Sequence, residues 1–212
     1  MLMFFFNRLP HGVERPKEEM ISNKIGHRLD PYIYRAFHRV FGDRGNPNFF
    51  TLMGFLATLA ASVFIIGDHW IVAGLMIILS GLFDLLDGAL ARNLGKVTPF
   101  GGFLDSVLDR YSDLFLLLAL LIYYLQRGDA AFVILASFAS MGTVLISYTR
   151  AKAEAARISC NIGLLERAER IILLSAGVLF GCIVPVFWVL AVLTHFTVLQ
   201  RIYYVWKKLN AP

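Results

Sequence analysis

Long apolar segments, separated by short polar breaks, make up most of the chain from Phe49 onward. A helix needs about 20 residues to cross the hydrocarbon core of a bilayer. Stretches of about this length lie at residues 49–66, 70–90, 101–125, 130–149, 165–184 and 186–205. The sequence therefore predicts an all-α integral membrane protein with six transmembrane helices.

The composition also favours a membrane protein. Hydrophobic residues make up 58% of the 212 residues and charged residues 17%, whereas soluble domains average about 45–50% apolar and about 25% charged. The two cysteines, Cys160 and Cys182, have no motif spacing, which argues against a disulfide framework or a zinc site. The opening run Met1–Phe6 is too short for the core of a signal peptide.

The placement of basic residues predicts the topology. The stretch 171–199 could form one long helix or two shorter ones, and charge favours two. With six spans, only Arg127 lies in the loops opposite the N-terminus. The other side holds Arg92, Lys96, Arg150, Lys152, Arg157, Arg167, Arg170, Arg201, Lys207 and Lys208. The positive-inside rule then places both termini in the cytoplasm and the protein in the inner (cytoplasmic) membrane.

Residues 1–47 are polar and basic and are expected to form a cytoplasmic N-terminal segment. Within them, Asp30 and Pro31 resemble a helix N-cap followed by a first-turn proline. Apolar residues then recur at helical spacing, at Leu29, Ile33, Phe37, Val40 and Phe41. This pattern predicts an amphipathic helix lying in the membrane interface next to the first span, although a soluble surface helix would show the same pattern.

Four aspartates form the most informative cluster in the sequence. Asp84 and Asp87 lie three residues apart and Asp105 and Asp109 four apart, so each pair shares one face of its helix. The two helices form a hairpin with its midpoint near Lys96, which places both pairs at about the same depth. A carboxylate costs about 2.5–3.5 kcal/mol at the centre of a membrane helix. Divalent cations, which prefer oxygen ligands, would offset this cost, whereas solvated or arginine-paired aspartates are the alternative.

Small residues and one arginine accompany the aspartates. Gly88 directly follows Asp87, and Ala91 lies one turn further on. Gly101 lies one turn before Asp105, and such positions let a backbone and a ligand approach closely. Arg92 could hold a diphosphate through paired hydrogen bonds, or could merely be a basic residue at the end of a span.

These residues resemble the signature of the CDP-alcohol phosphotransferases, D-x-x-D-G-x-x-A-R, eight residues, then G-x-x-x-D-x-x-x-D. The matching positions here are Asp84, Asp87, Gly88, Ala91, Arg92, Gly101, Asp105 and Asp109. Pro47–Thr51 is also similar to the family's entry to its first span. The resemblance implies that residues 48–212 form a six-span catalytic membrane domain that works as a homodimer.

The same resemblance implies roles for individual residues. Asp84, Asp87, Asp105 and Asp109 would bind Mg²⁺ or Mn²⁺, with two ions in the site. The CDP group would be held by Asp87, Gly88, Ala91, Arg92, Thr98, Gly101 and Asp105. Asp109 would take the proton from the attacking alcohol, and CMP would leave.

The acceptor alcohol is less strongly indicated. Three basic segments resemble the phosphatidylinositol phosphate synthase branch, which implies that Lys152, Arg170 and Arg201, with Arg150 and Arg167 beside them, bind the phosphate of inositol phosphate. Glycerol 3-phosphate, serine or a neutral alcohol stay open as acceptors. Alternatively, these basic residues serve topology and pair with Glu154, Glu166 and Glu169. The donor would be CDP-diacylglycerol or an archaeal ether-lipid equivalent, and no nucleic-acid partner is expected.

A function of another class also fits intramembrane carboxylates. They occur in cation transporters, and a six-span chain with four aspartates could carry a divalent metal. The acidic residues gather at one membrane face, however, and no polar residues lead to the other. This distribution favours the enzyme.

Overall fold

The computed structural model describes residues 45–210, and six α-helices make up most of this part of the chain. They are α2 (Pro47–Ile66), α3 (Trp70–Asn93), α4 (Pro99–Gln126), α5 (Ala130–Ala155), α6 (Arg167–Leu179) and α7 (Ile183–Leu209). Residues 45–210 contain no strand. The all-helical prediction is confirmed for this range, whereas the predicted amphipathic helix lies outside the described residues.

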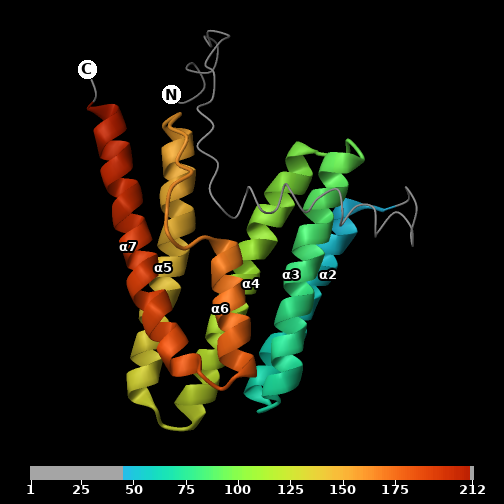
Figure 1. Cartoon of the computed structure of the whole chain (residues 1–212), viewed down its shortest axis with the longest axis vertical. Helices are drawn as coiled ribbons and strands as arrows, with labels where there is room; N and C mark the ends of the chain where they lie inside the picture. The colour runs from blue at the N-terminus through green and yellow to red at the C-terminus, as the bar shows by residue number, and fades with distance from the viewer. Residues whose placement is uncertain (1–44, 211–212) are drawn as a thin grey trace, which may run out of the picture.

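The six helices close into a ring (Figure 1). Helix α2 packs against α3 and α4, α5 packs against α4 and α7, and α6 joins α3 to α7. Because the chain alternates in direction, the C-terminal halves of α3, α5 and α7 meet the N-terminal parts of α4 and α6 at one end of the bundle. Helix α6 begins only part-way along the bundle (Figure 1).

Most predicted spans agree with the helices, and the fifth is the exception. The predicted span at 165–184 is a helix of only 13 residues, α6, which at 1.5 Å per residue is about 20 Å long. The predicted break at Pro185 is wrong. The chain turns at Gly181, whose φ is +68°, and Pro185 lies in the first turn of α7, where a proline is tolerated because no helical donor is lost.

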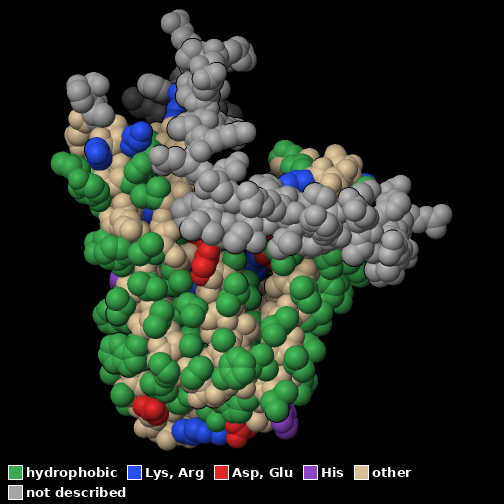
Figure 2. Space-filling view, viewed as in Figure 1, with side chains coloured by type: hydrophobic (Ala, Val, Ile, Leu, Met, Phe, Trp, Pro, Cys, Tyr) green, Lys and Arg blue, Asp and Glu red, His purple; other side chains and the backbone are tan. Residues whose placement is uncertain are grey.

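Within residues 45–210, four helices, α2, α3, α5 and α7, are long and apolar enough to cross a membrane by length and composition. The 28-residue helix α4 carries four charged side chains before its apolar second half, at Asp105, Asp109, Arg110 and Asp113. The outer surface supports lipid contact. Many large apolar side chains are exposed on it, and they cover the body of the bundle between charged ends (Figure 2).

The inner faces of the helices pack through small residues. Ala61 and Ala73 are fully buried between α2 and α3, and Ala136 and Ala139 are fully buried on α5. Gly142 of α5 lies so close to α7 that an added Cβ atom would stand 2.7 Å from the Cβ of Thr194. Small side chains of this kind let membrane helices approach closely.

A polar cluster joins three helices at the opposite end of the bundle. Asp68, in the turn between α2 and α3, accepts hydrogen bonds from Trp70 Nε1 at 2.6 Å, Tyr123 Oη at 2.8 Å and Arg127 Nη2 at 3.0 Å. The Arg127 guanidinium lies 3.5 Å from the centre of the Tyr123 ring. The hydrogen bond from Tyr123, followed by that from Trp70, lowers the pKa of the Asp68 carboxyl below its usual 3.8. This cluster attaches the first helical hairpin to the end of α4.

Candidate metal and substrate site

The α3–α4 hairpin brings the four predicted aspartates to one end of the ring. Gly95, with φ +64°, makes the turn after α3. Thr98 then caps α4 by accepting a hydrogen bond from the Gly101 backbone at 3.0 Å. One carboxylate oxygen each from Asp84, Asp105 and Asp109 lies within 4.8 Å of the other two.

Asp87 lies beside this group and is the most buried of the four aspartates, with 7% of its surface exposed. Its Oδ2 atom and the Oδ1 atom of Asp105 are buried and have no hydrogen-bond partner among the described residues. Burying an unsatisfied acceptor costs about 1–3 kcal/mol, and more if it is charged. Divalent cations bind such carboxylate oxygens, so this donor set fits the Mg²⁺ or Mn²⁺ site that the sequence predicts.

Arg167 is the cation that the structure places against these carboxylates. Its Nη1 atom lies 2.5 Å from Asp84 Oδ1 and 2.9 Å from Asp109 Oδ1. The arginine comes from the first residue of α6, where Glu166 and Glu169 form a capping box. The sequence suggested Arg167 only as a residue for the acceptor's phosphate, so this double ion pair is an addition from the structure.

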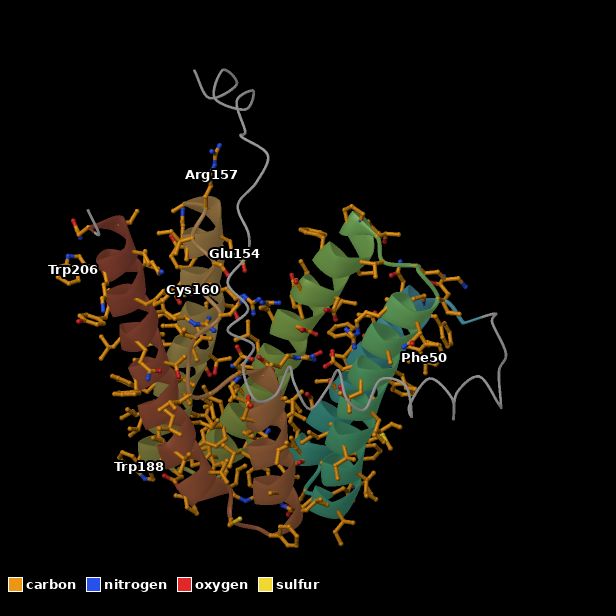
Figure 3. The ribbon with its side chains drawn as sticks, turned by 45° about the horizontal axis from the view of Figure 1, so that its top comes forward. Phe50, Glu154, Arg157, Cys160, Trp188 and Trp206 are labelled. Carbon is orange, nitrogen blue, oxygen red and sulfur yellow. The ribbon has the colours of Figure 1, made fainter. Side chains whose placement is uncertain are left out.

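A cavity of about 980 Å³ opens beside the carboxylates. The five helices α3–α7 contribute to its wall. The predicted residues that line it are Asp84, Asp87, Arg92, Asp105, Asp109, Arg150, Arg167, Arg170 and Arg201. Glu154 of α5, which borders the cavity, points from α5 toward α4 in Figure 3. The structure thus brings the predicted metal residues and four of the five predicted acceptor residues into one space.

The four acceptor arginines differ in how firmly they are held. Arg170 pairs with Asp113 at 2.6 Å, and both side chains are under 10% exposed. Arg201, 2% exposed, donates to the backbone oxygens of Ile162 at 2.8 Å and Ile146 at 2.6 Å. Buried guanidinium groups with fixed partners are preorganised to bind an anion.

The two remaining predicted acceptor residues are more exposed. Arg150 pairs with Glu154 at 3.0 Å, as the topology alternative expected. Lys152 does not line the cavity, and its Nζ lies 5.7 Å from the centre of the Tyr148 ring. The structure therefore does not bring Lys152 to the cavity with the arginines.

Four predicted nucleotide residues, Gly88, Ala91, Thr98 and Gly101, do not line this cavity. The two glycines instead allow close packing near it. An added Cβ at Gly88 would lie 3.1 Å from the guanidinium nitrogens of Arg92, and one at Gly101 would lie 2.9 Å from Thr98 Oγ1. Gly88 thus makes room for Arg92, and Gly101 makes room for the cap of α4.

Asp113 is the site residue that the sequence analysis missed. It lines the cavity and holds Arg170. A signal was present, because Asp105, Asp109 and Asp113 recur every four residues on one face of α4. The family signature ends at Asp109 and does not include this third carboxylate.

The comparisons with known proteins agree with this geometry. The sequence model of the CDP-alcohol phosphatidyltransferases matches residues 45–200. An archaetidylinositol phosphate synthase from Methanothermobacter thermautotrophicus is 40% identical over 169 residues, which cover 77% of this chain and 84% of that one. A second, from Pyrococcus horikoshii, is 40% identical over 165 residues, covering 77% and 85%.

Solved structures show the same fold. The crystal structure of Mycobacterium tuberculosis phosphatidylinositol phosphate synthase with CDP-DAG bound has a TM-score of 0.73 and 30% identity, covering 84% of this chain and 94% of that one. The same enzyme in complex with manganese and citrate has a TM-score of 0.69 and 29% identity, covering 84% and 88%. With the clustered carboxylates and the apolar outer surface, these likenesses show that the chain is a multi-pass membrane enzyme that belongs to the CDP-alcohol phosphatidyltransferase family.

Proposed function

We propose that the chain transfers a lipid phosphate group from a CDP-linked lipid to a hydroxyl of inositol phosphate, with release of CMP. The observation that carries the proposal is the shared cavity, which is lined both by the carboxylates that could bind metal ions and by buried arginines. A donor diphosphate needs the first group, and an acceptor with its own phosphate needs the second.

The carboxylates would hold the donor. Asp84, Asp87, Asp105 and Asp109 would bind the cations, which supply charge neutralisation of the diphosphate and of the leaving CMP. Arg92 borders the same cavity and would add a fixed positive charge beside the diphosphate. Gly88, Ala91, Thr98 and Gly101 would shape the wall near the nucleotide, in part through the close packing at Arg92 and at the cap of α4.

Asp109 would act as the general base. Its side chain is 16% exposed and borders the cavity on the side of Arg167 and Arg170. A carboxylate there would lie between the donor and an alcohol bound against the arginines, and it would take the proton from the attacking hydroxyl. Transfer of the lipid phosphate to that oxygen would then release CMP.

The cavity has an apolar side suited to a lipid donor. Its lining includes Leu85, Phe103, Tyr111 and Leu114, and all four are exposed on the outside of the bundle. A CDP-lipid could keep its chains against this surface while its head group reaches the aspartates. This arrangement suits diacyl and ether-linked chains equally, because the head group alone enters the polar region.

Unused hydrogen-bond donors favour an anionic acceptor. The Nε atoms of Arg167 and Arg170 are buried and have no hydrogen-bond partner among the described residues. Arg201 adds a third buried guanidinium. Three such groups around one space would bind a phosphate dianion strongly and would leave a neutral alcohol such as inositol without enough contacts.

The membrane arrangement is part of the proposal. All six helices would cross or enter the inner membrane, with the cavity and both termini on the cytoplasmic side, because basic residues gather at that end of the bundle. The segment 1–47 would be cytoplasmic and would contain an amphipathic helix lying on the interface, and the chain would work as a homodimer, as the resemblance implies. Family membership argues against the cation transporter.

The test is an assay of CMP release by the purified full chain in detergent or lipid. It uses one CDP-lipid, Mg²⁺ or Mn²⁺, and a panel of acceptors at equal concentration, namely inositol phosphate, inositol, glycerol 3-phosphate and serine. We expect rapid CMP release with inositol phosphate and with no other acceptor of the panel. Faster release with glycerol 3-phosphate would replace the proposed acceptor, and metal flux in vesicles without any CMP release would overturn the enzyme assignment.

A further inference from the structure

The contacts of Arg167 place a positive charge where a shared metal ion would bind. Its Nη1 atom is within 3 Å of one oxygen of Asp84 and one of Asp109. Both oxygens belong to residues of the carboxylate cluster. A Mg²⁺ ion bound between these two oxygens at its usual distance of about 2.0–2.1 Å would overlap Nη1 and repel the guanidinium. Arg167 in this position and such a cation therefore exclude each other.

The arginine does not satisfy the site completely. With Arg167 in place, Asp105 Oδ1 and Asp87 Oδ2 lack hydrogen-bond partners among the described residues, and so does Arg167 Nε. An arginine that served only to neutralise the aspartates would be expected to use its donors more fully. Because both the carboxylates and the guanidinium keep unsatisfied atoms, we infer that the carboxylates bind a further cation and that the guanidinium binds a further anion.

Arg167 shares its cavity with the arginines of the acceptor side. Arg167 is the first residue of α6 and directly follows the N-cap residue Glu166. The same cavity holds the Arg170 and Arg201 guanidinium groups, on the acceptor side of the aspartates. Because Arg167, Arg170 and Arg201 line one cavity, a rotation about the side-chain bonds of Arg167 is the movement that would bring its guanidinium from the aspartates toward these arginines.

We propose that Arg167 is an internal counter-cation that a divalent metal displaces from Asp84 and Asp109, and that the displaced guanidinium then binds the phosphate of the acceptor. The second half rests on the proposed function. Metal binding thus completes the anion site, so metal binds before the acceptor. Arg167 is a positioning residue for the metal step and a binding residue for the acceptor step.

The test measures metal binding by calorimetry, with Mn²⁺ as the probe and no CDP-lipid present. Arg167→Gln is compared with Arg150→Gln. The control variant removes a positive charge from the same cavity, but Arg150 pairs only with Glu154 among the ion pairs of the described residues and contacts none of the aspartates in them. We expect Arg167→Gln to tighten Mn²⁺ binding by roughly tenfold relative to the control, about the effect of losing one competing charge-assisted hydrogen bond. Equal or weaker Mn²⁺ binding in Arg167→Gln would overturn the proposal.

A second variant and a second ligand complete the experiment. Arg167→Lys keeps the charge but loses the planar fork, so its Mn²⁺ affinity should lie between those of the wild type and Arg167→Gln. Inorganic phosphate is then titrated with and without Mn²⁺. The gain in phosphate affinity on adding Mn²⁺ should be smaller in Arg167→Gln than in Arg150→Gln, and equal gains would rule out the move to the acceptor side.

The outcomes also separate this inference from the proposed function. Mn²⁺ and phosphate binding are measured without any acceptor alcohol or turnover. If the acceptor panel gave no CMP release while Arg167→Gln still bound Mn²⁺ more tightly, the displacement would stand and the reaction would need revision. The reverse result would remove the displacement and leave the reaction intact.

Discussion

The buried ion pair between Asp113 and Arg170 offers a strong test of how α4 and α6 are held together. Asp113 Oδ2 lies 2.6 Å from Arg170 Nη2, and the two side chains are 7% and 5% exposed. Asp113→Ala would leave the arginine charge buried beside the cavity without its partner. Because water cannot easily reach it, the loss should be that of a broken buried pair, about 3–5 kcal/mol in the free energy of unfolding.

The pair between Arg150 and Glu154 provides the matched control. Its N–O distance is 3.0 Å, but the side chains are 42% and 54% exposed. Pairs on the surface contribute only about 0.2–1 kcal/mol because water and salt screen them. We therefore expect Glu154→Ala to cost at least about 2 kcal/mol less than Asp113→Ala.

Unfolding of the purified protein in mild detergent, followed by circular dichroism as denaturant is added, would measure both variants. A double variant, Asp113→Leu with Arg170→Met, should recover most of the loss, because an apolar pair of similar volume removes the uncompensated charge. The same double variant should lose acceptor binding while retaining Mn²⁺ binding. The reasoning would be refuted if Asp113→Ala cost no more than Glu154→Ala.

Three further predictions test the base, the opposite end of the bundle and the helix packing. Asp109→Asn should abolish CMP release while CDP-lipid binding persists, as measured by calorimetry; near-normal turnover would exclude Asp109 as the base. Asp68 has a lowered pKa, so its contribution to stability is present above about pH 4 and is lost on acidification through the lower folded pKa. Asp68→Asn should therefore lower the melting temperature clearly at pH 6 and much less at pH 3, and an equal shift at both would contradict this. Gly142→Val should cost about 1–3 kcal/mol because its Cβ meets Thr194, whereas Gly102→Ala, with open space around it, should not destabilise the protein.

The main features of the fold were predictable because each depends on local chain chemistry. Runs of apolar residues and the breaks between them predicted six helices, and the bounds of α2–α4 agree within three residues, whereas α5 continues six residues past its predicted end. Helix α6 was predicted too long because the apolar run continues through Phe180 to Val184. Hydropathy cannot detect the turn at Gly181, which depends on a left-handed backbone conformation and not on polarity.

The candidate site was predictable in its acidic half. Helical periodicity sets which aspartates share a face, and the short turn between α3 and α4 sets their common depth. These two local rules were enough to predict that Asp84, Asp105 and Asp109 would lie together. The basic half was predicted only as a group, since the arginines lie on three other helices whose rotation the sequence pattern leaves open.

By itself, the sequence determined that the chain builds apolar helices, that one helical hairpin carries a carboxylate cluster, and to which family that hairpin corresponds. Only the tertiary structure decided the partners of each charge. Arg167 meets Asp84 across 83 positions of sequence, and Arg170 meets Asp113 across 57. Such pairs depend on the rotation and height at which α6 packs beside α3 and α7, and these are set by the summed packing of many side chains. Local sequence patterns cannot predict this packing, because each side-chain contact stabilises the structure only when the helices already lie side by side.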